Sequence, residues 1–114
     1  MITKENAIYQ INQKFDLRLN KLNTNWSNIN ANGIWSVEPN CNRRSSNLYL
    51  LLNNNHSKKI HVFEIPANHD VFHKLYVRND KNVFRLLFNV SDLHFIETLG
   101  HINFANFHKG FVEY

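Results

Sequence analysis

The sequence is poor in cysteine, glycine and proline, with one, three and two of these residues among 114. The lone cysteine, Cys41, cannot form an internal disulfide, and no CxxC or paired Cys/His spacing typical of structural zinc occurs. The glycines are too far apart to form a phosphate-binding loop or the turn of a serine nucleophile elbow. These scarcities exclude a disulfide framework, a zinc module and the common nucleotide-binding loops.

Long apolar runs are also missing. No segment approaches the ~18 consecutive apolar residues of a membrane-spanning helix, and residues 1–6 lack the basic-then-apolar pattern of a signal peptide. A single cysteine favours a reducing compartment, and we expect Cys41 to be a surface thiol. We therefore expect a soluble, cytoplasmic protein with no membrane contact.

What the chain does contain is a large share of aromatic residues. Nine Phe, four Tyr and two Trp, with a hydrophobic fraction of 43%, predict a folded globule. A length of 114 residues suits one domain, which we assign to residues 1–114. Thirteen Lys and Arg against nine Asp and Glu give a net charge of +4, which is compatible with a polyanionic partner without identifying one.

The first element is an amphipathic helix predicted over residues 4–22. Thr3 is its expected N-cap. Another face carries Lys14, Arg18 and Lys21, which form either an ordinary solvated surface or part of a basic one. Apolar residues that recur every three or four positions predict the helix: Ile8, Ile11, Phe15, Leu19 and Leu22.

The middle of the chain predicts β-structure. Residues 23–32 predict an irregular loop, and residues 34–38 predict a short strand. Residues 48–52 and 60–65 predict a hairpin joined by an asparagine-rich turn. The first hairpin strand is continuously apolar, which indicates a central strand covered on both faces.

The second half mixes short helices and strands. Asn68 can cap a helix over residues 69–77, and residues 83–90 predict a strand. Residues 92–99 predict a second short helix that ends at a glycine, with a strand over residues 93–98 as the alternative.

The tail, residues 101–114, predicts an edge strand or a hairpin that turns at Lys109-Gly110. An unpaired strand there could join the sheet of a second copy, so a homodimer is one predicted assembly. The whole order predicts a single α+β domain, in which an N-terminal helix precedes a mainly antiparallel sheet with one or two short helices.

This order of elements, with Glu64 near the end of the third strand, resembles the core of the PD-(D/E)XK nuclease superfamily over roughly residues 3–88. In that family, an acid on the second strand and the acid of an acid-spacer-lysine motif on the third strand hold magnesium. The lysine helps to position or activate the attacking water. The resemblance therefore implies Glu64 as the catalytic and metal-binding acid, with Mg²⁺ as the cofactor of an active member.

The chain departs from the family motif at two positions. Asn47, a neutral ligand, stands near the position of the second-strand acid, and Pro66 replaces the lysine. The resemblance leaves Lys74, on the following predicted helix, as the candidate replacement for that lysine, and Asn47 as the second metal ligand. Because this catalytic set is incomplete, our leading expectation is a non-enzymatic protein without a cofactor.

Histidine is frequent, but its spacing does not define a metal site. His69 and His73 are four residues apart, which on one helix would suit a metal. No third ligand is evident nearby, so we expect capping or surface roles. The spacing of seven between His94, His101 and His108 we attribute to chance.

A basic, aromatic surface is the other candidate site. Lysines and arginines flank both ends of the predicted hairpin, where they could contact phosphates. Trp26, Trp35 and Tyr49 lie near them in sequence and could stack on bases, or could instead belong to the core. The predicted nucleic-acid-binding residues are Arg43, Arg44, Lys58, Lys59, Lys14, Arg18 and Lys21.

We therefore expect a small binding protein that occupies a protein or nucleic-acid surface, of the kind encoded in mobile elements, defence or counter-defence systems and toxin-immunity loci. The alternative is a metal-dependent nuclease of the PD-(D/E)XK type, or an inactive descendant of one, that uses Glu64.

Overall fold

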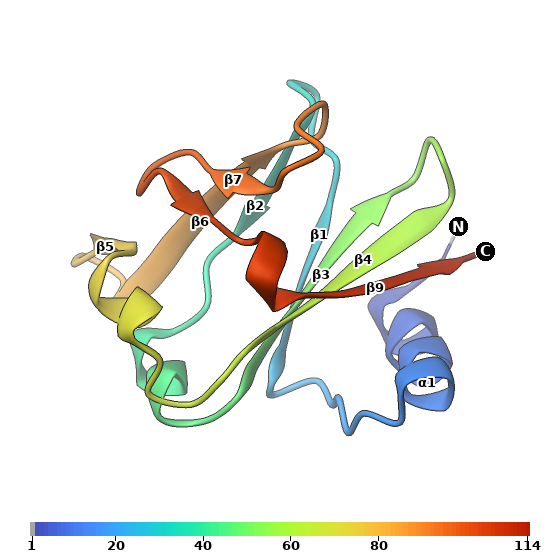
Figure 1. The fold of residues 1–114 in the computed structure, drawn as a ribbon, viewed down its shortest axis with the longest axis horizontal. Coiled ribbons are helices and arrows are strands. Elements are labelled where there is room, and N and C mark those ends of the chain that lie inside the picture. The colour runs from blue at the N-terminus through green and yellow to red at the C-terminus, as the bar shows by residue number, and fades with distance from the viewer. Residues whose placement is uncertain (1) are drawn as a thin grey trace.

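A computed structural model describes residues 2–114 and shows an α+β fold with one N-terminal helix and two mostly antiparallel sheets (Figure 1). The predicted fold class is therefore confirmed, with the strands divided between two sheets. Sheet A contains, in spatial order, β1 (Thr24–Asn28), β3 (Leu48–Asn54), β4 (Lys59–Ile65) and β9 (His108–Glu113). Sheet B contains β2 (Ile34–Val37), β6 (Val83–Asn89), β7 (Ile96–Glu97) and β8 (Ile102–Asn103), and β5 (Tyr76–Arg78) pairs with β6. The helices are α1 (Lys4–Phe15) and the short 3₁₀ turns η1 (Cys41–Ser45), η2 (Asp70–His73) and η3 (Ala105–Phe107).

Helix α1 begins as predicted, at Thr3, whose side-chain oxygen accepts a hydrogen bond from a backbone N–H of the first turn at 3.2 Å. It ends at Phe15, earlier than predicted, because Asp16 adopts a left-handed conformation with a φ of 52°. The Asn12 side chain then binds the backbone N–H and C=O of Leu19 and keeps Leu19 buried near the helix. The apolar spacing thus extends beyond the helix itself.

The predicted basic stripe of this helix does not form as one helical face. Lys14 lies on α1, whereas Arg18 and Lys21 lie in the segment that follows it. The Lys21 ammonium pairs with the Glu5 carboxylate at 2.6 Å, and both side chains are exposed. An early end to the helix therefore separates residues that the sequence places on one stripe.

Strand β3 lies inside sheet A and is buried on both faces, as its apolar run predicts. One neighbour is its predicted hairpin partner, β4, and the other is β1, which runs parallel to it. The predicted loop over residues 23–32 is therefore wrong for β1. Its asparagine-rich sequence has low β propensity, but Thr24 and Ser27 are buried, and pairing with β3 outweighs that propensity.

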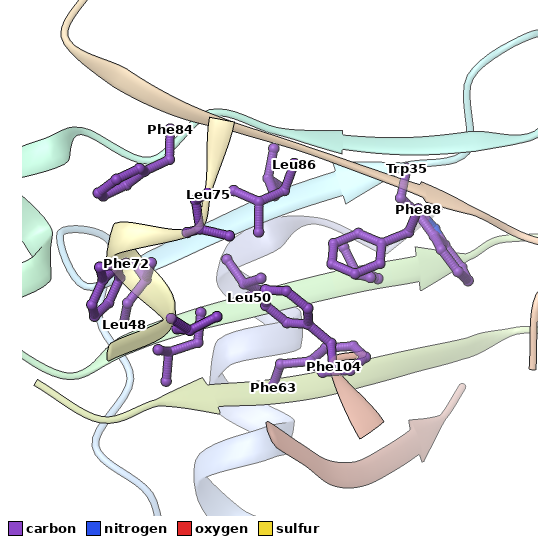
Figure 2. Packing of buried hydrophobic residues seen from close by; sticks show 14 of the residues in the cluster. Trp35, Leu48, Leu50, Phe63, Phe72, Leu75, Phe84, Leu86, Phe88 and Phe104 are labelled. Carbon is purple, nitrogen blue, oxygen red and sulfur yellow. The ribbon is translucent and has the colours of Figure 1, made fainter. Parts of the chain in front are cut away.

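Sheet A separates two hydrophobic cores. The larger core fills the space between the sheets, where Leu86 and Phe88 of β6 face Leu50 of β3 (Figure 2). The smaller core lies under α1, which buries Ala7, Ile8 and Ile11 against the other face of sheet A. Of the aromatic residues predicted as base-stacking or core, Trp35 and Tyr49 are buried, and Trp26 packs against the smaller core.

The helix predicted over residues 69–77 is wrong. One 3₁₀ turn, η2, is followed by strand β5, although Val71, Phe72 and Leu75 are buried as the helical spacing predicts. The cap is His69, whose Nδ1 accepts the N–H of Val71, and Asn68 precedes it with a positive φ of 59°. A short turn buries the same apolar residues and leaves the chain free to pair with β6.

The helix predicted over residues 92–99 is also wrong, and the strand alternative holds for β7. The fully buried Glu97 carboxylate accepts backbone N–H groups from Leu87 on β6, at 2.9 Å, and from Leu99 and Gly100 at 3.0 and 2.7 Å. These bonds stabilise an extended segment and a turn, whereas a helix over residues 92–99 would bond the N–H groups of Leu99 and Gly100 internally.

The tail forms the predicted edge strand, β9, but Lys109-Gly110 lies at a bulge inside that strand and not at a hairpin turn. The expected surface thiol, Cys41, is instead buried and packs in the larger core. Within residues 2–114, no helix combines the length and the apolar character that crossing a bilayer requires.

Candidate functional site

Glu64, the predicted catalytic acid, lies on β4 with its side chain only 18% exposed. Its Oε2 accepts a hydrogen bond from the Tyr49 hydroxyl at 2.8 Å, and its Oε1 lies 3.1 Å from the Lys109 ammonium. Burial, followed by the hydrogen bond to Glu64, raises the pKa of Tyr49, so the phenol remains a donor. The carboxylate is therefore held on both oxygens by side chains of this chain.

Lys109 was missed by the sequence reasoning, which considered Lys74 as the lysine partner of Glu64. Val62 pairs with Gly110 and Phe63 pairs with His108, so Lys109 is the extra residue of a β-bulge. A bulge redirects a side chain relative to its strand. The only signal was the Lys-Gly dipeptide, which is also typical of a turn.

The predicted second metal ligand, Asn47, lies beside Glu64 but uses its amide within the protein. Its Nδ2 faces Glu64 Oε2 at 3.5 Å, and its Oδ1 accepts the backbone N–H of Ala67 at 2.9 Å. A magnesium ion needs several oxygen ligands with free lone pairs. The single carboxylate, already paired with an ammonium and a phenol, does not fit that ion. In the described part of the chain, no three His, Cys, Asp or Glu side chains gather as a metal-binding group.

Lys74 lies in a different place. It follows η2 as its C-cap and lines a cavity next to η3, together with Asp70 and Phe107. The lysine that the structure brings to Glu64 is therefore Lys109, from the edge strand.

The predicted basic residues fall at two ends of sheet A. Arg43 and Arg44 belong to η1, just before β3 begins, whereas Lys58 and Lys59 lie where β4 begins, beyond the far end of β3. Because β3 and β4 pair along their full length, a strand of about 20 Å separates these two groups. The seven residues therefore do not form one patch.

A lysine cluster does form along the edge strand. The Lys14 and Lys59 ammonium groups lie 5.4 and 4.8 Å from the ring centroid of Phe111, and Lys58 lies 5.8 Å from that of Tyr114. Lys14 also donates a hydrogen bond to the Phe111 carbonyl at 2.7 Å. We call these five residues the lysine–aromatic edge.

The charge of this edge is not balanced by ion pairs. The ion pairs found within residues 2–114 involve Lys21, Arg78 and Lys109 as cations, and none involves Lys14, Lys58 or Lys59. The nearest acid in the ladder, Glu113, is the register partner of Lys59. One glutamate therefore accompanies three lysines here, and the lysine–aromatic edge keeps an excess of positive charge.

A histidine pair lies beside this edge. His61 Nδ1 and His108 Nε2 are 3.2 Å apart, and the ring of Phe95 contacts both imidazoles. Burial, followed by the positive potentials of His108 and Lys59, lowers the pKa of His61 from 6.5 to about 4. Burial also lowers the pKa of His108. A neutral pair of this kind shares one hydrogen bond and supports the junction between β4 and β9.

Two cavities flank His69. One, of about 270 Å³, lies between η1 and η2, and the other, of about 310 Å³, lies between η2 and η3. The predicted residues Arg44, His69 and His73 line the first, and Lys74 lines the second. Sequence spacing alone could not bring Arg44 to η2.

No family model matches this chain, and comparisons with curated proteins and with solved structures also found no match. The resemblance to the PD-(D/E)XK core therefore stays a prediction.

Proposed function

We propose that this protein is a non-enzymatic nucleic-acid-binding protein that holds a phosphate backbone at the lysine–aromatic edge. The observation that carries the proposal is the convergence of Lys14 and Lys59 on the single ring of Phe111, at 5.4 and 4.8 Å. Neither lysine has a carboxylate ion-pair partner among residues 2–114. An anionic partner can neutralise this excess charge.

The position of these ammonium groups favours phosphate in particular. Two like charges near one ring repel each other, and this repulsion is offset by cation–π attraction and by the bond from Lys14 to the Phe111 carbonyl. A phosphate between them removes the repulsion and releases its counterions. Phe111 acts in this proposal by positioning the lysines.

A third lysine, Lys58, lies beside Tyr114, just beyond the end of β9. Three cations without ion-pair partners among residues 2–114 suit the closely spaced phosphates of a nucleic acid. Lysine contacts a phosphate as a point charge and reads no base edge. We therefore expect salt-dependent binding with little sequence preference.

Fluorescence anisotropy with labelled DNA and RNA, single- and double-stranded, tests this proposal across a salt series. The double variant Lys14→Ala/Lys59→Ala should bind at least about tenfold more weakly, and should reduce the slope of log K against log salt by about 2, one for each lost phosphate contact. Lys81→Ala/Arg85→Ala removes the same charge from exposed positions in the β5–β6 region and is the matched control. Arg43→Ala/Arg44→Ala tests the other predicted basic group.

Failure of the wild type to bind any of these nucleic acids at low salt would overturn the proposal. Equal weakening by the matched control would show that net charge, and not this edge, is responsible. If an acidic protein binds through Lys14 and Lys59 while nucleic acid does not, the partner class is protein.

A metal-dependent nuclease is the second candidate, because the β-bulge brings a lysine, Lys109, to the predicted acid Glu64, although their 3.1 Å ion pair occupies that acid. We expect no cleavage of plasmid or single-stranded substrates with Mg²⁺, because the Glu64 carboxylate is paired and no second acid accompanies it. Magnesium-dependent cleavage that Glu64→Ala abolishes would contradict the non-enzymatic proposal, with Glu113→Ala as the control for an exposed acid.

A further inference from the structure

The cavity between η1 and η2 has the donor set of an anion site. Four of its five lining residues carry side-chain N–H groups, and none carries a carboxylate. Its volume, about 270 Å³, lies just below the range of about 300–1,000 Å³ typical of pockets for drug-sized ligands. A small anionic group therefore suits it better than a whole cofactor. The lining residues are Arg44, Asn68, His69, Phe72 and His73.

A hydrogen bond from the backbone fixes the tautomer of His69. Its Nδ1 accepts the N–H of Val71 at 3.0 Å, so in the neutral ring the proton is on Nε2. The ring also packs edge-on against Phe107, with centroids 5.0 Å apart. The Nε2–H is therefore a donor on a side chain that borders both cavities.

Arg44 is held at the cavity through its backbone. Its carbonyl accepts the N–H of Asn68 at 2.7 Å, which joins η1 to the start of η2. The guanidinium takes part in no ion pair found within residues 2–114. A planar guanidinium with parallel N–H donors matches the oxygens of a phosphate.

The base of the cavity is apolar and firmly packed. Phe72 is only 4% exposed, and its ring lies 5.5 Å from that of Phe84 in the larger core. The neighbouring cavity between η2 and η3 differs, because its one ammonium, from Lys74, is accompanied by the Asp70 carboxylate. A phosphate dianion is therefore favoured more in the first cavity, which has no carboxylate in its lining.

We infer that the cavity between η1 and η2 binds the phosphate group of a phosphate monoester, with Arg44, His69 and His73 as its donors. The site lies at the end of β3 opposite to Lys58 and Lys59, so it is separate from the lysine–aromatic edge and does not depend on the proposed function. The monoester has two sources, a free mononucleotide or the phosphorylated end of a nucleic acid.

Two-dimensional amide NMR of the full chain tests the inference. Titration with inorganic phosphate or adenosine monophosphate, at constant ionic strength set by chloride, should shift the Asn68, His69 and His73 amide signals saturably, and adenosine should not. Arg44→Gln, which keeps hydrogen-bonding capacity but not charge, should weaken binding at least about tenfold. Arg43→Gln removes the adjacent charge, which does not line the cavity, and should change the affinity less than about twofold.

His73→Asn is the second variant and should also weaken binding, so the inference stays testable if Arg44→Gln perturbs η1. A 5′-phosphorylated oligonucleotide and its unphosphorylated form identify the source. Shifts with the phosphorylated oligonucleotide alone assign the site to a nucleic-acid end, and stronger shifts with the mononucleotide assign it to a free ligand. The inference is overturned if phosphate and the monoesters cause no saturable shifts, if adenosine binds equally well, or if both variants retain wild-type affinity.

Discussion

At the scale of single residues, the surroundings of His61 determine its charge. The ring is packed among aromatic side chains, including Trp35 and Phe95, and lies next to His108 and Lys59. Burial and these positive neighbours disfavour the imidazolium, which lowers the pKa of His61 from 6.5 to about 4. The folded protein therefore takes up a proton at His61 only under acidic conditions.

The stability of the protein should consequently fall as the solution is acidified. The unfolded chain protonates His61 below a pH of about 6.5, whereas the folded chain does so only near a pH of about 4. The unfolded state binds more protons in this window, so the contribution is complete above about pH 6.5 and is lost as the pH falls toward about 4.

We expect His61→Phe, which keeps an aromatic ring but cannot protonate, to lose less stability than the wild type in that window. Urea unfolding at about pH 7 and about pH 5 measures the loss. His56→Phe, in the exposed β3–β4 turn, is the control and should behave like the wild type. An unchanged pH dependence in His61→Phe would contradict the prediction.

At the scale of elements, the bulge in β9 joins the edge strand to α1 and to Glu64. Lys109 is the extra residue, and the following Gly110 has a φ of 138°, which side-chain-bearing residues rarely adopt. A Cβ on Gly110 would lie 3.0 Å from Cε1 of Phe15, at the end of α1. The bulge therefore requires glycine for both its backbone and its contact with the helix.

Gly110→Ala should destabilise the fold more than Gly33→Ala does. Both positions have positive φ, but a Cβ on Gly33, whose φ is 72°, meets open space. The contact with Phe15 should account for a further loss of about 1–3 kcal/mol in the free energy of unfolding of Gly110→Ala. Urea unfolding of the two variants measures this difference, and equal losses would show that the Phe15 contact carries no cost.

At the scale of the whole molecule, sheet A is the shared wall of two cores, and β9 is its edge beside α1 (Figure 1). The buried Asn53 on β3 forms hydrogen bonds with residues of both sheets and of the C-terminus. Its carbonyl accepts the indole N–H of Trp35, and its side chain bonds to Asn28 and to the Tyr114 hydroxyl. Strands from both sheets therefore meet at one polar residue.

The homodimer predicted from an unpaired C-terminal strand stays a prediction. Two features of the free edge of β9 disfavour pairing with the strand of a second copy. The bulge interrupts regular strand pairing, and the Phe111 carbonyl already accepts a hydrogen bond from Lys14. We expect sedimentation to give a monomer mass of 13.6 kDa. Lys14→Ala, which frees the carbonyl, should increase any tendency to dimerise. A wild-type dimer in which the β9 amides are protected from hydrogen exchange would contradict this expectation.

Element types were predictable where the local pattern was strong. The start of α1, the β3–β4 hairpin and β6 follow from apolar periodicity and capping, which act over a few residues. The end of α1, strand β1 and the segments around η2 and β7 were mispredicted. The left-handed backbone of Asp16 ends α1, and contacts between distant segments decide the others, as the Glu97 carboxylate does for β7.

The candidate sites were less predictable than the fold. Glu64 and Asn47 do lie together, whereas the position of Arg44 beside His69 and His73 was not predicted. The partner of Glu64, Lys109, was not predictable, because it comes from a strand far along the chain and is turned by a bulge. The same holds for Lys14 and Lys59, which come from α1 and β4 and meet at Phe111 on β9.

By itself, the sequence determined the α+β class, the first helix and the central hairpin, because periodic burial of apolar side chains is encoded residue by residue. Only the tertiary structure decided which charged groups meet. Strand pairing and the packing of α1 place Lys14 and Lys59 on one ring, Lys109 on Glu64, and Arg44 beside His73. These contacts depend on the register between strands and on the bulge in β9. The periodicity of a single segment specifies neither.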